Sequence, residues 1–131
     1  MLKEQVIRFY SELWNLKNLD EMPSILLPDF SFRGSLGDVK QGYSGFTEYV
    51  NKVHSALSDY HCDIEDLIEE DQKVFAKMKF TGTHCEELLG YPATFKEVNW
   101  DGCAIFTFIQ RKISDVWVLG DLYSLEAQLK G

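Results

Sequence analysis

Apolar residues recur at the spacing of an α-helix in two parts of the first half of the chain. In residues 2–16 and again in residues 44–58, they follow one another at intervals of three and four, which predicts two amphipathic helices. Asn18 and Asp20 are typical caps, and they predict a shorter second helix that ends near Pro28. The apolar positions of the two long helices are Val6, Ile7, Tyr10, Leu13 and Trp14, then Phe46, Tyr49, Val50, Val53 and Leu57.

The second half of the chain changes to a period of two, which is typical of strands. A first strand is already predicted at Asp29–Leu36, and Gly34, Gly37 and Gly42 predict that the segment after it is a loop. The turns between the later strands are so short that they require antiparallel hairpins. The four later strands are Tyr60–Glu70, Lys73–Leu89, Phe95–Gln110 and Lys112–Gln128.

Helices followed by a meander of strands predict an α+β domain over residues 1–131, with three N-terminal helices packed on a curved antiparallel sheet. Strands of about fifteen residues would exceed roughly 45 Å if they were straight. They must therefore curl, and a sheet that curls around helices forms a cone. The interior of such a cone is the usual place for a ligand.

The stretch Ile113–Gln128 contains the first candidate for chemistry. Read as one strand, it places Asp121 on the same face as Trp117 and Leu119. A carboxylate beside such apolar side chains is costly unless it is paired, hydrogen-bonded or protonated, which is typical of a functional site. The alternative is that Gly120 ends the strand and Asp121 faces solvent.

His84 is the second candidate. It shares its strand parity with Val74, Ala76, Met78 and Phe80, so it belongs to the set that faces the core, and it is the titratable member of that set. The alternative is a core histidine satisfied by one backbone carbonyl. If His84 and Asp121 face one cavity from neighbouring strands, they form a general acid–base pair.

Four motifs cover nearly the whole chain: Phe9–Asp20, Phe80–His84, Gly90–Thr94 and Lys112–Leu129. The most specific feature is Gly-Thr-His at 82–84 combined with the spacing from Trp117 to Asp121. With these motifs the chain resembles the SnoaL-like polyketide cyclases of the NTF2-like superfamily, whose fold is a cystatin-like cone. The chain departs from the family pattern at Glu86 and in Pro92–Lys96, which bears on substrate identity.

The resemblance implies an intramolecular aldol condensation that needs neither cofactor nor metal and closes a ring of a polyketide ester. It assigns Asp121 as the general acid–base residue and His84 as the residue that binds or polarises the substrate carbonyl. An activated carbon acid makes this chemistry feasible with positioning and one tuned carboxylate. An isomerase or dehydratase using the same pair, or a protein that binds a small molecule without turnover, are the alternatives.

The aromatic content of 14% is high enough to line a cavity for a small hydrophobic or aromatic molecule. Arg33 and His54 are polar candidates for substrate binding, although both also fit a solvated surface position. Asn51 is a third polar candidate, because it lies three residues before His54 on the same face of the predicted helix. The aromatic candidates for substrate binding, which also fit an ordinary core, are Tyr10, Trp14, Phe46, Trp100 and Trp117.

Charge and targeting signals exclude several classes of partner. A net charge of −8 disfavours nucleic acid and anionic membrane surfaces as partners. The N-terminal region carries charges within its apolar stretch, so we expect no signal peptide and no membrane span, and we expect a cytoplasmic protein.

By resemblance to the family we also expect a homodimer, with Phe75, Ile105 and Ile109 on the exposed face of the sheet.

A metal site is not expected. The three cysteines, Cys62, Cys85 and Cys103, are an odd number without CxxC spacing, which favours reduced thiols. The neighbouring His-Cys residues at 61–62 and 84–85 point to opposite faces of a strand and cannot bind one zinc ion together. The acidic residues between 63 and 71 do not have the spacing of an EF-hand.

Overall fold

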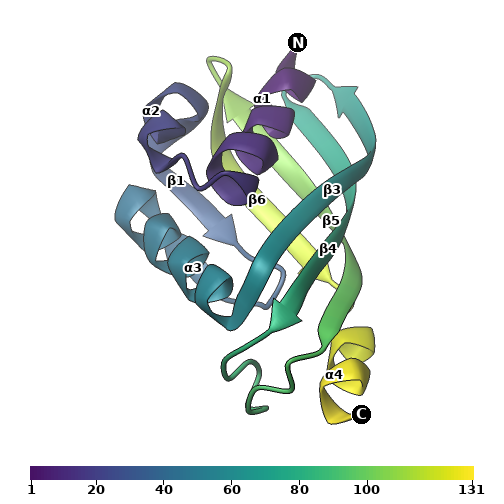
Figure 1. The fold of residues 1–131 in the computed structure, drawn as a ribbon. Coiled ribbons are helices and arrows are strands. Elements are labelled where there is room, and N and C mark those ends of the chain that lie inside the picture. Colours follow the sequence, from purple (N-terminus) through teal and green to yellow (C-terminus); the bar gives the residue numbers. More distant parts are fainter.

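One curved sheet of six strands carries helices on one of its faces (Figure 1). The computed structural model describes all residues, 1–131. The strands lie in the order β2-β1-β6-β5-β4-β3. They are β1 (Leu26–Arg33), β2 (Val39–Gln41), β3 (Leu57–Glu70), β4 (Lys73–His84), β5 (Glu97–Ile109) and β6 (Lys112–Gly120). The helices are α1 (Leu2–Arg8), the π-helical η1 (Phe9–Asn15), the 3-10 turn η2 (Leu19–Glu21), α2 (Met22–Ile25), α3 (Gly42–Ala56) and α4 (Leu122–Lys130). No helix combines the length and the apolar character needed to cross a bilayer.

The predicted meander is confirmed. Strands β3 to β6 are joined in antiparallel pairs, each to the next. Two of the predicted bounds were too wide, because β4 ends at His84 and β5 begins at Glu97. Residues 85–96 between them form a loop that contains a single isolated bridge from Leu88 to Tyr91.

The sheet is mixed, whereas the pattern predicts an antiparallel sheet throughout. β1 pairs in parallel with β6 and antiparallel with β2. The short strand β2 lies inside the segment expected to be a loop. A parallel pair needs a long crossover. Here α3 and the strands from β3 to β5 all lie between β1 and β6 in the chain, so local sequence patterns give no sign of the pairing.

The long strands bend at irregularities in their registers. The pairing of β3 with β4 shifts between Ser58 and His61 and again between Ile64 and Asp66. Beside the first shift, the side-chain amide of Asn15 makes two hydrogen bonds to the backbone of Cys62, of the kind that a neighbouring strand would make. It accepts from the Cys62 N–H at 2.9 Å and donates to the Cys62 carbonyl at 3.1 Å. This contact fixes the end of η1 against β3.

The prediction that the last strand extends to Gln128 is wrong beyond Gly120. β6 ends there, and after Asp121 the nine residues Leu122–Lys130 form α4. Asp121 is the N-cap of this helix, since its Oδ1 accepts a hydrogen bond from the Ser124 N–H at 3.1 Å. Aspartate is a preferred N-cap residue because it satisfies a free N–H of the first turn.

A bulge in β6 also reverses the expected side-chain parity. Ile113 pairs with Phe108, whereas Asp115 pairs with Thr107, so β6 carries one extra residue at this point. An extra residue moves every later side chain to the other face. Val116 and Val118 are consequently buried, while Trp117 is 40% exposed.

The core is a single cluster of 33 buried hydrophobic residues. Its centre is aromatic: the ring of Phe46 contacts those of Phe9, Phe30 and Phe32 at centroid distances of 5.1–5.5 Å. His84 is the single polar residue among the buried ones, with no exposed surface. Its prediction as a member of the core-facing set is therefore confirmed.

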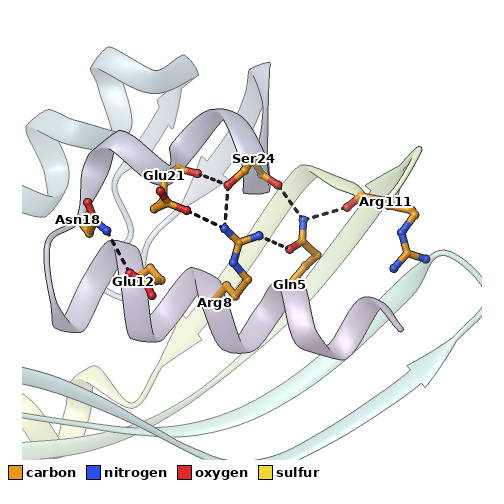
Figure 2. Close-up of polar contacts among 7 residues, drawn as sticks. All are labelled: Gln5, Arg8, Glu12, Asn18, Glu21, Ser24 and Arg111. Atoms are coloured by element: carbon orange, nitrogen blue, oxygen red, sulfur yellow. Dashed lines mark hydrogen bonds and ion pairs between the residues drawn. The ribbon is translucent and has the colours of Figure 1, made fainter.

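A polar network joins α1 to α2 and to the turn between β5 and β6 (Figure 2). The Gln5 amide donates to the carbonyls of Ser24 and Arg111 at 3.0 and 3.1 Å. Arg8 donates to the Gln5 amide oxygen at 3.0 Å, to Glu21 at 2.9 Å and to the Ser24 hydroxyl at 2.8 Å. These contacts hold the N-terminal helices across the end of the sheet.

Candidate functional site

Two aromatic side chains reach the interior from the π-helical segment η1. Tyr10 and Trp14 are four residues apart, which is nearly one full turn of a π-helix, so both point the same way. Both are buried, with 3% and 4% of their surface exposed. Short π-helical segments are frequent at functional sites.

Tyr10 and Trp14 line a small aromatic chamber inside the cone. Its free volume is about 10 Å³, which is room for about one water molecule. In this conformation the side chains themselves fill the interior. The other lining residues are Phe32, Ser35, Tyr49, Val53, Tyr60, Phe80 and Val118.

The turn at residues 34–38 closes one side of the chamber. The Leu36 N–H donates to the Tyr49 hydroxyl at 3.3 Å, and the tyrosine ring packs on Gly34, where a Cβ atom would lie only 2.4 Å from the ring. The Arg33 guanidinium donates to the Val118 carbonyl and so ties β1 to β6 just before this turn.

A second pocket lies directly outside the chamber and has a volume of about 190 Å³. Val53 lines both hollows, and Leu36 of the outer pocket follows Ser35 of the chamber. The ion pair between Lys52 and Asp38, at 3.1 Å, stands at its edge. The other lining residues are Ala56, Glu87, Leu88 and Leu89. The outer pocket therefore adjoins the chamber on the side of α3.

Three buried polar atoms have no hydrogen-bond partner: the Tyr10 hydroxyl, His84 Nε2 and Trp100 Nε1. The Tyr10 side chain lines the chamber. The Trp100 ring packs on Phe80, and its Nε1 lies beside Gly120, where a Cβ atom would approach it to 3.0 Å. A buried polar group without a partner is unfavourable and indicates a place for water or a ligand.

The tyrosines of the chamber keep their hydroxyl protons. Burial raises the pKa of Tyr10 and of Tyr60 well above the ordinary value, and the nearby Cys62 raises both further. Burial also raises the pKa of Tyr49. A protonated tyrosine hydroxyl can donate a hydrogen bond, so the Tyr10 hydroxyl is available as a donor.

The expectation that Asp121 and His84 share one cavity is wrong. The bulge in β6 and the start of α4 leave Asp121 exposed, and it lines a shallow groove with Phe75 and Lys77 on the outer face of the sheet. His84 lies on the opposite, inner face of β4. No carboxylate is among the lining residues of the chamber.

The other predicted binding residues are spread over five environments. Tyr10 and Trp14 line the chamber, and Trp100 packs against the wall that Tyr60 and Phe80 form. Phe46 lies in the core, and Asn51 is exposed on α3. Arg33 and Trp117 face outward together, with the guanidinium carbon 5.8 Å from the ring centroid. Arg33, Asn51 and Trp117 are therefore not brought to the chamber.

His54 supports the chamber from behind. Its ring stacks on Trp14 at 6.2 Å and meets Tyr60 edge-on at 5.4 Å. His54 Nε2 lies 2.8 Å from the Trp14 carbonyl, which can only accept, so Nε2 carries the proton. Burial lowers the pKa of His54, partly offset by this hydrogen bond.

Sequence reasoning missed most of the lining residues. Tyr49 and Val53 belong to the apolar stripe of α3, and Tyr60 and Phe80 have the inward parity of their strands, so a core assignment explained them equally well. Ser35 belongs to no apolar or alternating pattern from which a lining residue could be predicted.

No group of three or more His, Cys, Asp or Glu side chains is arranged to hold a metal ion.

Comparisons with known proteins agree on the fold. The family model described as SnoaL-like polyketide cyclase matches residues 4–129. No curated protein matches the chain. The structure is similar to that of a candidate polyketide cyclase from Bacillus cereus, with 26% identity and a TM-score of 0.81, over 98% of this chain and 80% of that one.

Two further structures are similar. TsrD from Streptomyces laurentii has 23% identity and a TM-score of 0.85, over 97% of this chain and 92% of that one. A SnoaL-like polyketide cyclase from Agrobacterium tumefaciens has 21% identity and a TM-score of 0.83, over 98% of both chains. The predicted fold class, an α+β NTF2-like cone, is confirmed.

We predict that His54 makes stability depend on pH. The unfolded chain takes up the proton near pH 6.5, whereas burial lowers the pKa of His54 in the folded protein. The unfolded state therefore binds more protons just below about pH 6.5, so this part of the stability is lost as the pH falls through that window. The free energy of unfolding should fall less between about pH 7.5 and 5.5 in His54→Gln than in the wild type.

Urea unfolding at each pH measures this difference. Glutamine can still donate to the Trp14 carbonyl, so the hydrogen bond is preserved. Asn51→Ala, on the exposed surface of the same helix, controls for a general effect on α3. Equal pH dependence in His54→Gln and the wild type would contradict the prediction.

Proposed function

Because the chain belongs to the SnoaL-like polyketide cyclase family, we propose that it is a cyclase- or isomerase-type enzyme acting on a small hydrophobic carbonyl or ester compound. In this proposal the carbonyl oxygen of the substrate takes the place of the one water molecule for which the aromatic chamber has room, and the chain's own side chains donate hydrogen bonds to that oxygen. The rest of the substrate occupies the outer pocket, with which the chamber shares Val53.

The observation that supports this proposal most directly is the presence of unpartnered donors in an otherwise apolar interior. The Tyr10 hydroxyl and Trp100 Nε1 can each donate a hydrogen bond and have no acceptor in the fold. A carbonyl oxygen supplies an acceptor. As a proton leaves the carbon next to the carbonyl, negative charge builds up on that oxygen, and fixed donors stabilise it more strongly than they stabilise the neutral carbonyl.

The donors, rather than a carboxylate, carry the catalysis in this proposal. By stabilising the enolate they make the carbon more acidic, and a water molecule accepts its proton and passes it to the solvent. Because the carbonyl oxygen fills the chamber, this water molecule lies in the outer pocket, which has a volume of about 190 Å³. Asp121, the acid–base residue that the family resemblance assigns, would have to leave its place at the N-terminus of α4 to take part.

We also propose that two copies of the chain pair through the outer face of the sheet. Four apolar side chains form a continuous row there, because each is the register partner of the next: Ile68, Phe75, Ile105 and Trp117. They are 37–57% exposed. Ile109 lies on the same outer face of β5 and is 53% exposed. Such a contiguous row on a sheet face is typical of an interface.

We predict opposite effects for two Tyr→Phe substitutions. Tyr10→Phe removes a buried hydroxyl without a partner, so stability should be unchanged or higher by up to about 3 kcal/mol. Catalysis should fall by about tenfold or more, because a donor to the developing enolate is lost. Tyr43→Phe removes a hydroxyl that donates to the Leu26 carbonyl at 2.9 Å outside the chamber. It should cost about 0.5–1.5 kcal/mol and leave catalysis unchanged.

The catalytic measurement is exchange of the central protons of ethyl acetoacetate for deuterium in D₂O, followed by NMR and corrected for the spontaneous rate. Urea unfolding gives the stabilities. If the wild type binds the ester without accelerating exchange, the chain is a non-catalytic binder. If Tyr10→Phe is destabilised as much as Tyr43→Phe, the Tyr10 hydroxyl has a structural partner and the proposed donor role fails.

We predict that Asp121→Asn leaves the exchange rate within about threefold of the wild type. Asparagine is as good an N-cap as aspartate, so α4 should remain folded and its stability should not change measurably. The same exchange assay and urea unfolding check both points. A loss of about a hundredfold with unchanged stability would instead assign the base to Asp121 and require its side chain to reach the chamber.

We predict a dimer by sedimentation at micromolar concentration, with twice the chain mass of 15.1 kDa. Ile105→Lys places a charge in the middle of the apolar row and should give a monomer. Val39→Lys is the matched control, because Val39 is 73% exposed on β2 and lies outside the row. A wild-type monomer, or a dimer that survives Ile105→Lys, would contradict the proposed interface.

A further inference from the structure

The loop after β4 folds back on His84. The His84 N–H donates to the Lys96 carbonyl at 2.9 Å, and the Phe95 N–H donates to the His84 carbonyl at 2.8 Å. Phe95 has a positive φ of 59°, a conformation that non-glycine residues seldom adopt. This backbone arrangement brings Thr94 against the imidazole ring of His84.

Thr94 makes two contacts to the same ring nitrogen. Its hydroxyl oxygen lies 2.9 Å from His84 Nδ1, and its backbone N–H lies 3.2 Å from that atom. A backbone N–H can only donate, so Nδ1 must be an acceptor. The Lys96 N–H donates to the Thr94 hydroxyl oxygen at 3.3 Å, which leaves the hydroxyl proton directed at Nδ1.

The proton of the neutral ring must then be on Nε2. That atom is buried and has no partner in the fold. We propose that Thr94 is a positioning residue that fixes His84 as the tautomer with its proton on Nε2, so that His84 offers a hydrogen bond to the substrate carbonyl. The role toward substrate rests on the proposed function, whereas the tautomer does not depend on it.

The contacts of Thr94 decide whether His84 acts as a base or as a hydrogen-bond donor. A base needs a free lone pair, and the one on Nδ1 is already occupied by Thr94. Nε2 carries a proton and has no lone pair to offer. Toward a substrate, His84 therefore has only the role of a hydrogen-bond donor, and it does not remove the proton from carbon.

Nitrogen-15 NMR of the full chain tests the tautomer directly. The chain has three histidines, so the ring signals of His84 are identified by their loss in His84→Gln. We expect the wild type to show an unprotonated Nδ1 and a protonated Nε2. The hydroxyl contact, at 2.9 Å, is the shorter of the two contacts to Nδ1. Thr94→Val loses it and keeps only the backbone N–H contact at 3.2 Å, so the spectrum should show a larger share of the tautomer with its proton on Nδ1 than the wild type shows. Thr94→Ser should restore the wild-type spectrum.

Deuterium exchange of ethyl acetoacetate in the same variants tests the role in catalysis. We expect Thr94→Val to lower the rate by about tenfold and Thr94→Ser to restore it. Thr107→Val, which removes a hydroxyl on the outer face of β5 that contacts Lys73, should change neither the spectrum nor the rate. Urea unfolding verifies that each variant is folded.

The outcomes separate the two proposals. A proton on Nδ1 in the wild type, or a spectrum and rate unchanged in Thr94→Val, would overturn the role of Thr94. The expected tautomers without accelerated exchange in any variant would leave the positioning by Thr94 established and overturn the proposed function. An altered spectrum with an unchanged rate would exclude His84 as a donor to the substrate.

Discussion

The length of the strands is the constraint on which the rest of the structure depends. β3, β4 and β5 contain 14, 12 and 13 residues, and strands of this length fit a domain of this size only if they bend. The bends occur at register shifts, in β3 beside Asn15 and in β6 at its extra residue. The curvature creates an interior, and the extra residue in β6 decides which side chains of β6 point into it. Both the chamber and the outward position of Asp121 follow from where the strands bend.

Local periodicity predicted the elements that depend on local sequence. The helices in the first half, the four long strands and the inward position of His84 all follow from spacing within one segment. The bulge in β6 could not be predicted, because Ile113 and Val116 are both apolar and the alternating reading remains plausible. The interpretation of Asp121 as an inward-facing residue is wrong for this reason, and the alternative, that Gly120 ends the strand and Asp121 faces solvent, is confirmed. α4 was missed because its apolar residues also fit a strand.

The residues that line the chamber could not be predicted from the sequence for a different reason. Tyr49, Tyr60 and Phe80 have the same pattern as ordinary core residues, and what distinguishes them is the position of their rings in three dimensions. The contacts of Thr94 depend on a loop that folds back over ten residues, for which the sequence contains no periodic signal. Unpartnered donors in this interior each cost about 1–3 kcal/mol, a large share of the 5–15 kcal/mol that holds a typical domain together. A loss of this size is understandable if the donors serve a ligand.

The parallel pairing of β1 with β6 also has a consequence for how the chain folds. Phe32 and Val116 are register partners although most of the sequence separates them. Contacts between such distant segments form slowly, because a long loop has to close before they are made. During synthesis, β1 leaves the ribosome long before its partner strand exists. We therefore expect the hairpins from β3 to β6 to form early, with the interior sealed only when β1 docks on β6. The functional site of this chain would then be among the last parts of the molecule to be assembled.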